Sequence, residues 1–406
     1  MTLQELDQWE NSFQSFHARF SDLFPRLESR EQARKYLRGL LAPVERKNGW
    51  QLAEVVGDES PDRMQRLLYQ VNWDPDAARD RLEDFVIENF ADPEGIGVLD
   101  ETGFIKKGKS SVGVQRQYTG TAGKVENSQV GVFLTYATPK GHVFLDRKLF
   151  LPESWANDPE RRTKAGVPDS IAFQSKPQQA IAMLEHAWKG VVPMKWVTGD
   201  EVYGNSPQLR EAIETSGRWY VLAVASTIEV WTDAPCVEAP GEKTGGRRRT
   251  KPRLCPDAAP SRTVASFVAE WLSEQWERLS VAEGEKGLRV YDWAMARVIE
   301  KRDELPGSEV WLLARRSVSN PEEIAYYLAF APVDIALQKL AEVASTRYTV
   351  EQCFEEGKGE TGLDHYEVRQ YLSWYRHITL SMMAHAWLSS IRSEMEEKRG
   401  TLSLAA

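Results

Sequence analysis

Two short apolar segments of this chain each lead directly into an aspartate. Residues 96–99 (Ile-Gly-Val-Leu) precede Asp100, and residues 196–199 (Trp-Val-Thr-Gly) precede Asp200. Short apolar runs of this kind are typical of buried strands. Mg²⁺ prefers oxygen ligands and is often held by a few carboxylates. Two strand-borne aspartates therefore predict one sheet that builds a divalent-metal site.

The pattern of apolar residues changes near residue 95. Residues 1–93 show helical spacing and predict a helical N-terminal domain, a kind of domain that often binds DNA. Alternating or continuous apolar runs then predict strands at 96–104, 113–119, 130–138 and 142–150. A helix at 176–189, a strand at 195–198, a helix near 206–215 and a strand at 219–224 follow. This order predicts an α/β fold with a mixed sheet flanked by helices.

The second half of the chain breaks this rhythm. Residues 94–225 are predicted as the first part of the sheet-containing core, and 226–320, rich in Pro and Gly, as an insertion subdomain with strand-like pieces at 288–299 and 309–315. Residues 321–395 are predicted as C-terminal helices that complete the core. They open with a helical segment at 321–341, and helices at 347–358 and 371–391 flank a loop at 359–364.

Composition narrows the class of protein. With 42% hydrophobic residues in 406, the chain is globular and long enough for two or three structural units. Its three cysteines lack metal-ligand spacing, and their odd number argues against a disulfide framework, which favours a reducing cytosol. No signal peptide or membrane span is recognised, so a cytoplasmic location is expected.

Charge is distributed unevenly along the chain. The formal net charge is −9, yet every charged residue between 102 and 125 is basic, including Lys106, Lys107 and Lys109. A second basic tract contains Arg247, Arg248 and Arg249, for which a solvated loop is an equally good interpretation. Segregated positive charge predicts one phosphate-facing side.

A third acid is expected on a late helix. Glu351, Glu355 and Lys358 share one helical face at i, i+4 and i+7, while Val350, Cys353 and Phe354 are expected to pack inward. Glu351 would then lie at the border between core and surface, where a ligand facing the sheet belongs. Glu355 and Glu356 lie close enough in sequence to compete for this role.

These motifs together resemble the DDE transposases of bacterial insertion sequences, a family with an RNase H-like fold. Asp100 and Asp200 resemble the first two acids. One branch has a Y-R-E-K signature, in which three residues separate Arg from Glu and six separate Glu from Lys; Arg347, Glu351 and Lys358 match these spacings. Ala344 occupies the Tyr position, which is a departure from the signature. The gap between Asp200 and Glu351 resembles family members with an insertion there.

The resemblance implies a two-metal reaction on DNA. Asp100, Asp200 and Glu351 would hold two Mg²⁺ ions, with Mn²⁺ able to substitute, for cleavage at transposon ends and strand transfer into a target. The implied partners are double-stranded DNA, as terminal inverted repeats and target, and a second copy of the chain, because two ends must be joined; when bound to DNA the protein would associate with the bacterial nucleoid. The residues expected to contact DNA are Lys106, Lys107, Lys109, Arg247, Arg248, Arg249, Arg347, Lys358, His365 and Arg369.

Alternatives remain open from the sequence. A phosphoryl-transfer enzyme with Asp100 as nucleophile is one, although Thr102 stands where such enzymes have a second Asp. A transposase-derived DNA-binding protein without catalysis is another. Trp231, Trp293 and Trp311 could hold a flipped base in a hairpin reaction, but core packing is the favoured interpretation for each, so the hairpin pathway is left undecided.

Overall fold

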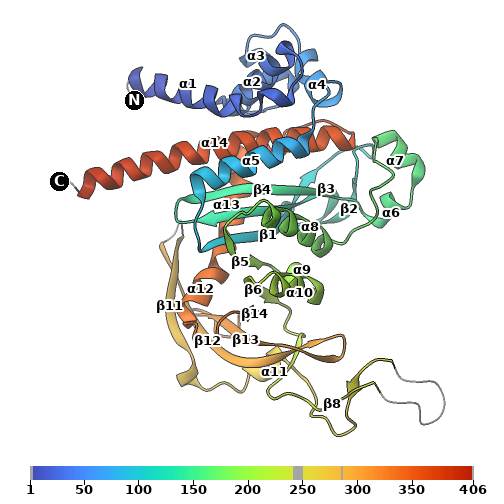
Figure 1. Ribbon diagram of the computed structural model, residues 1–406, viewed down its shortest axis with the longest axis vertical. Helices are drawn as coiled ribbons and strands as arrows, with labels where there is room; N and C mark the ends of the chain where they lie inside the picture. Colours follow the sequence, from blue (N-terminus) through green and yellow to red (C-terminus); the bar gives the residue numbers. More distant parts are fainter. Residues whose placement is uncertain (1–2, 241–249, 285–286, 405–406) are drawn as a thin grey trace. The chain divides into compact units, whose positions relative to one another are not determined.

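A computed structural model describes residues 3–240, 250–284 and 287–404. By its internal contacts the chain divides into a first unit, Met1–Met194 with Tyr348–Ala406, and a second unit, Lys195–Arg347. The two units are described separately (Figure 1). These two units are defined by contacts between residues distant in sequence and do not test the domain bounds drawn at 93, 225 and 320. Those bounds stay predictions.

The sheet of the first unit is built around one long central strand. Its strands are β1 (Gly95–Ile105), β2 (Gln115–Thr119), β3 (Lys124–Thr138) and β4 (Gly141–Phe150). β3 pairs with β1 along one edge, and with β2 and then β4 along the other, always antiparallel. The four predicted strands are therefore present. β3 is buried along most of its length, which agrees with its near-continuous apolar sequence from Val130 onward.

Helices make up the rest of the first unit. They are α1 (Leu3–Ala18), α2 (Leu27–Leu41), α3 (Gly49–Val55), α4 (Asp62–Tyr69), α5 (Pro75–Phe90), α6 (Glu153–Ala156), α7 (Pro159–Ala165), α8 (Lys176–Lys189), α13 (Tyr348–Thr361) and α14 (Tyr371–Leu404), with a short 3-10 turn at Ser21–Leu23. The predicted helical N-terminal segment is thus confirmed. α8 has the predicted bounds because its start is locally encoded: the Ser175 side chain and Gln178 form a capping box, and Pro177 occupies the first turn.

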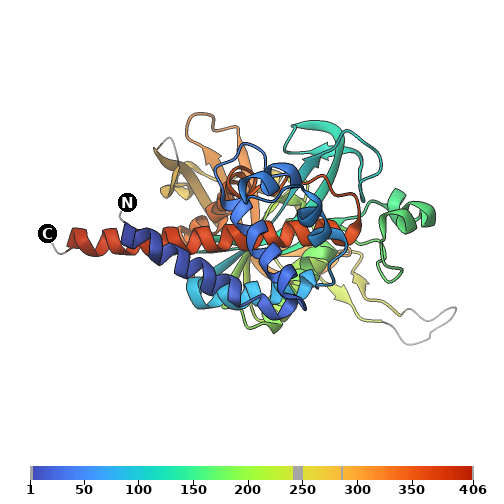
Figure 2. The same ribbon diagram turned by 90° about the horizontal axis from the view of Figure 1, so that it is seen from above.

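The long helix α14 organises the packing of the first unit. It contacts α2, α4, α5, α13 and β4, and Figures 1 and 2 show α5 running beside it over the strands. Two ion pairs fix α5 to β4: Arg79 Nη1 lies 2.8 Å from Asp146 Oδ1 in a buried pair, and the buried Arg147 Nη1 lies 2.9 Å from Oδ1 of the exposed Asp76. α13 packs against β1, β3 and β4 as well as α14, so its position depends on this core.

The second unit also contains both strands and helices. Its strands are β5 (Met194–Gly199), β6 (Trp219–Val224), β7 (Glu229–Trp231), β10 (Arg262–Thr263), β11 (Glu277–Gly284), β12 (Gly287–Arg302), β13 (Leu305–Ser317) and β14 (Ile324–Phe330). β5 and β6 are parallel, whereas β6 pairs with β14, β14 with β13 and β13 with β12 in antiparallel register. Its helices are α9 (Glu201–Gly204), α10 (Pro207–Thr215), α11 (Val264–Val268) and α12 (Leu337–Thr346), with a 3-10 turn at Ser273–Gln275.

Two predictions about the C-terminal half need correction. The segment 321–341 does not open as a helix, because Ile324–Phe330 forms β14 between β6 and β13. The predicted loop at 359–364 is shorter at its start, because α13 continues to Thr361. The predicted mixed α/β class is confirmed.

The prediction that the odd number of cysteines argues against disulfide bonding was wrong. Cys236 and Cys255 form a disulfide beside the small ribbon of β8 (Val237–Glu238) and β9 (Arg253–Leu254), and Cys353 is free and buried. An odd number of cysteines leaves room for one bridge, so the argument for a reducing compartment loses its support. Among the described residues, no helix is both long enough and apolar enough to cross a membrane.

Candidate functional site

Asp100 lies within β1 rather than at its end. It pairs in register with Phe133 of β3, and the strand continues to Ile105. The apolar run stops at Asp100, but the backbone pairing does not, which corrects the expectation that the strand delivers this residue at its terminus. The side chain is half-buried, and Oδ1 accepts a hydrogen bond of 2.8 Å from the Glu101 N–H. Val98 and Leu99 are fully buried and hold this part of the strand in place.

Asp200 belongs to the second unit and directly follows β5. It is the N-cap of α9: its Oδ1 accepts a 2.9 Å hydrogen bond from the Val202 N–H. Capping is the ordinary role of an aspartate at this place. Tyr203 lies in α9 just after Asp200. Its side chain is fully buried, as a packing residue would be.

The acids of α13 separate into two kinds. Glu351 in the first turn and Glu355 are exposed, while Val350 and Cys353 are fully buried, as the predicted inward face requires. Glu356 is half-buried and bonded to two histidines and an arginine. Glu356 is therefore engaged elsewhere, which leaves Glu351 and Glu355 as the exposed acids among the three candidates on this helix.

The basic segment after β1 also separates into two kinds. Lys107 and Lys109 are exposed, as a DNA contact requires. Lys106 instead donates from Nζ to the Tyr366 carbonyl at 3.1 Å and lies 3.5 Å from the centre of the Tyr366 ring. Burial lowers the pKa of Lys106 to about 8. Lys106 thus has a structural role in the first unit.

The later DNA-contact candidates occupy varied environments. Lys358 is half-buried and donates to Thr121 Oγ1 at 3.1 Å, and burial lowers its pKa. His365 Nδ1 accepts from the Lys47 N–H at 3.0 Å, whereas Arg369 is exposed. Arg347 caps the end of α12 in the second unit. Arg247, Arg248 and Arg249 lie outside the described residues.

Arg369 lines a pocket of about 350 Å³ in the first unit, between α2, α3, α4 and the loop before α14. Trp50 and Tyr69, also on its wall, expose 65% and 51% of their surface. Aromatic side chains beside a cation are suited to stacking on bases. Nothing in the sequence patterns drew attention to these two aromatic residues.

The three tryptophans considered for a flipped base are mainly packing residues. Trp231 and Trp293 are buried, and the Trp231 Nε1–H donates to the Ala259 carbonyl. Trp311 is half-buried, and its Nε1–H donates to the Pro332 carbonyl at 3.2 Å. The core interpretation is confirmed for Trp231 and Trp293.

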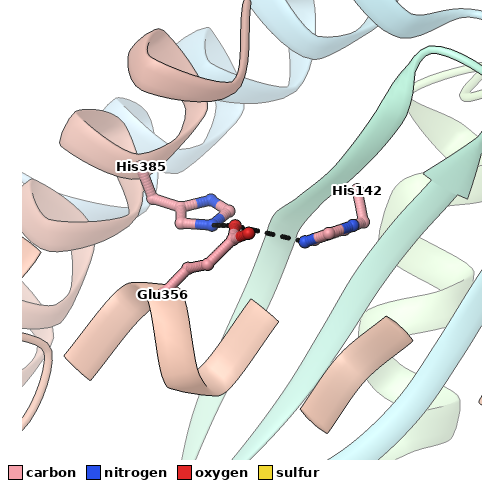
Figure 3. Close-up of side chains that lie close together, drawn as sticks. All are labelled: His142, Glu356 and His385. Atoms are coloured by element: carbon pink, nitrogen blue, oxygen red, sulfur yellow. Dashed lines mark hydrogen bonds and ion pairs between the residues drawn. The ribbon is translucent and has the colours of Figure 1, made fainter. Parts of the chain in front are cut away.

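One cluster in the first unit escaped the sequence reasoning. His142, Glu356 and His385 come from β4, α13 and α14, and their side chains converge (Figure 3). Their separations of 214 and 29 residues match no short metal motif. No signal in a single sequence could have joined them.

Comparison with known proteins agrees with the sequence pattern. A family model described as "DDE superfamily endonuclease" matches residues 19–288, which include Asp100 and Asp200 but not Glu351. The probable transposase for insertion sequence element IS701 of Microchaete diplosiphon is 29% identical over 188 residues. The match covers 46% of this chain, and the chain spans about half (46%) of that relative's length.

Two solved structures show limited likeness. A piggyBac transposase synaptic complex with hairpin DNA aligns with 90% of this chain and 67% of its own, at 9% identity and a TM-score of 0.42. The NurA nuclease from Sulfolobus solfataricus aligns with 69% of this chain and 85% of its own, at 9% identity and a TM-score of 0.28. Scores this low do not establish a shared fold. The family match, in contrast, extends over more than half of the chain. On that ground this protein belongs to the DDE superfamily endonucleases, in agreement with the motifs of the sequence.

Proposed function

We propose that this protein is an insertion-sequence transposase that cleaves DNA at transposon ends and transfers the released 3′-hydroxyl into target DNA. The family match over both aspartates carries this proposal. Asp100 in β1 and Asp200 after β5 supply the strand-borne carboxylates that such a reaction needs. An RNase H-like arrangement of the core is part of the same proposal.

Asp100, Asp200 and Glu351 are proposed as the acids that would hold the metal ions. The fit rests on donor chemistry: all three are carboxylates, neither aspartate is fully buried, and Glu351 is exposed. Such hard oxygen donors suit Mg²⁺ and accept Mn²⁺. When bound, the ions would activate the attacking oxygen and neutralise charge on the phosphate and leaving group.

The protein's own residues would position the DNA. Lys107, Lys109 and Arg369 are exposed cations suited to backbone phosphates, which fix register without reading sequence. Arg347 and Lys358 would hold the terminal nucleotides, as the family signature implies. A pair of chains acting on two ends is proposed because the reaction joins both ends to one target.

The test is a cleavage and strand-transfer assay on the DNA that flanks the coding sequence. A linear fragment carrying both flanks is incubated with the protein, a supercoiled target plasmid and Mg²⁺ or Mn²⁺. We expect nicking at defined flank positions and joined products with either metal, and no product with chelator.

The controls distinguish the rival functions. Asp100→Asn and Asp200→Asn should abolish both products while DNA binding is kept. DNA binding by the wild-type chain with neither product would favour a non-catalytic DNA-binding protein. Phosphate covalently trapped on Asp100 would favour a phosphoenzyme and contradict the transposase.

A further inference from the structure

The His142–Glu356–His385 cluster is built from three separate elements of the first unit. His142 Nε2 and His385 Nε2 each lie 3.2 Å from the same oxygen, Oε2 of Glu356 (Figure 3). The side chains of His142 and Glu356 are 15% and 14% exposed, and that of His385 is 1% exposed. Three ligating groups thus converge at the edge of the core, and the proposed transposition chemistry uses none of them.

The second oxygen of Glu356 is held from the other side. Arg392 Nη1 lies 2.8 Å from Oε1, and the Gln352 side-chain amide donates to Oε1 at 3.3 Å. These partners fix the carboxylate so that Oε2 faces the two imidazoles. A carboxylate with one oxygen oriented by neighbours and the other facing histidines resembles a one-oxygen metal ligand supported by its outer shell.

The two nitrogen-to-oxygen distances match a tetrahedral metal site. Zinc bonds to nitrogen and oxygen of roughly 2.0–2.1 Å place neighbouring ligand atoms about 3.3 Å apart at tetrahedral angles. The two observed nitrogen-to-oxygen distances are 3.2 Å. Two histidines and one carboxylate form a known zinc donor set that leaves a fourth position for water.

In the metal-free chain, Nε2 of His142 and Nε2 of His385 each lie at hydrogen-bond distance from Glu356. Zinc would take the place of the protons in these contacts, because the metal binds neutral imidazole nitrogens and an ionised carboxylate.

We propose that His142, Glu356 and His385 bind one zinc ion. A pocket of about 250 Å³, lined by His142, Gln352 and Arg392 among others, borders the cluster and gives the fourth position access to solvent. The ion would fasten α13 to β4 and α14. Glu351 lies in the first turn of α13, so the zinc ion would act as a structural support for the helix that carries the proposed third acid.

A second group of three ligating residues in the first unit is less suitable. His186 Nε2 lies 3.0 Å from Asp80 and 3.4 Å from Glu83, but Arg79 Nε also pairs with Asp80 at 2.7 Å. Burial raises the pKa of Glu83 to about 8, so this carboxyl is protonated at neutral pH. This group serves as a matched control.

The experiment measures zinc bound by the full chain. The protein is stripped with chelator, given Zn²⁺ or Co²⁺, desalted and analysed for metal content, visible Co²⁺ absorption and thermal unfolding. We expect one retained zinc equivalent, tetrahedral Co²⁺ bands and a rise in Tm of a few degrees on zinc addition. His142→Gln should weaken zinc binding at least about tenfold and remove the Tm rise, although its amide can still donate to Glu356.

The controls separate this site from other metal sites. His186→Gln should keep the retained zinc, and Asp100→Asn should keep it too, because the proposed Mg²⁺ acids are not involved. His385→Gln is a second ligand variant if His142→Gln folds poorly. Wild-type protein that retains no zinc after desalting, or an unchanged zinc affinity and Tm rise in His142→Gln, would overturn the proposal and leave a hydrogen-bonded cluster.

Discussion

Two regions of the first unit hold charged residues in opposite ways. On α14 and the adjacent α13, the ionisable side chains of Glu356, His385 and His377 are each bonded to partners in or near the core. At the proposed DNA-facing surface, Glu351, Lys107 and Lys109 are exposed. A buried charge is tolerated only when it is paired, whereas an exposed charge stays accessible to solvent and to DNA. The contrast teaches which acid of α13 serves stability and which is available for chemistry.

The strongest test of this comparison neutralises Glu351, the exposed acid proposed as a metal ligand. Glu351→Gln should lower the rate of DNA cleavage by about three orders of magnitude, because a lost metal ligand forfeits several kcal/mol of charge stabilisation. Its Tm should stay within a degree or two of wild type. The measurement is single-turnover cleavage with parallel thermal unfolding.

Glu355→Gln is the matched control for this change, because Glu355 is also exposed on α13. It should cleave at nearly the wild-type rate. If Glu355→Gln abolished cleavage and Glu351→Gln did not, the assignment of the third acid would pass to Glu355.

Neutralising the half-buried acid should have the reverse effect. Glu356→Gln removes an ionised acceptor shared by His142, His385 and Arg392, and breaking such a network should cost about 3 kcal/mol in unfolding free energy. Denaturant unfolding in chelator-containing buffer measures this cost. Glu360→Gln, which removes the exposed partner of the same Arg392, should cost less than about 1 kcal/mol; equal losses would contradict the distinction.

The stability of the protein at acidic pH tests the buried ionisable residues. His377 accepts from the Tyr36 hydroxyl at 2.9 Å and donates to the Gly362 carbonyl at 3.0 Å, and burial lowers its pKa to about 3. Below pH 6.5, His377 is protonated in the unfolded chain but stays neutral in the folded chain. Stability should therefore fall by about 1.4 kcal/mol per pH unit from this residue alone as pH drops from 6.5 towards 3.

Denaturant midpoints at pH 7, 6 and 5 test this expectation. His377→Gln keeps a donor and an acceptor without a titratable ring. The pH slope of its unfolding free energy should therefore be smaller than that of wild type by the contribution of about one bound proton. An identical pH slope in wild type and variant would show that His377 does not govern the acid response.

The smallest effect should come from the lysines after β1. Lys107→Ala with Lys109→Ala should weaken DNA binding several-fold and reduce the salt dependence of affinity by up to about two phosphate contacts, with stability unchanged. Lys106→Met should instead cost about 1 kcal/mol of stability through the lost bond to Tyr366. Fluorescence anisotropy across a salt series separates the two; an unchanged salt slope in the double variant would remove both lysines from the DNA surface.

Local signals explain which elements could be predicted. The helix at Lys176–Lys189 and the strand at Trp219–Val224 match at both ends, because a capping box or a short apolar run marks them. β14 could not be recognised in the same way, since the segment becomes a strand through its pairing with β6 and β13, which are distant in sequence. The disulfide between Cys236 and Cys255 likewise depends on a contact across 19 residues.

The sequence by itself determined the family, the mixed α/β class and the candidate acids, because strand and helix periods and the ordered Asp, Asp and Arg-Glu-Lys motifs are local features. Tertiary structure decided how individual charges are used. It placed Asp100 inside β1, turned Lys106 onto Tyr366 and surrounded Glu356 with His142 and His385. Burial and partner choice arise only when segments far apart in sequence pack together, so the roles of Glu351 and Glu356, five residues apart, could be told apart only in the folded chain.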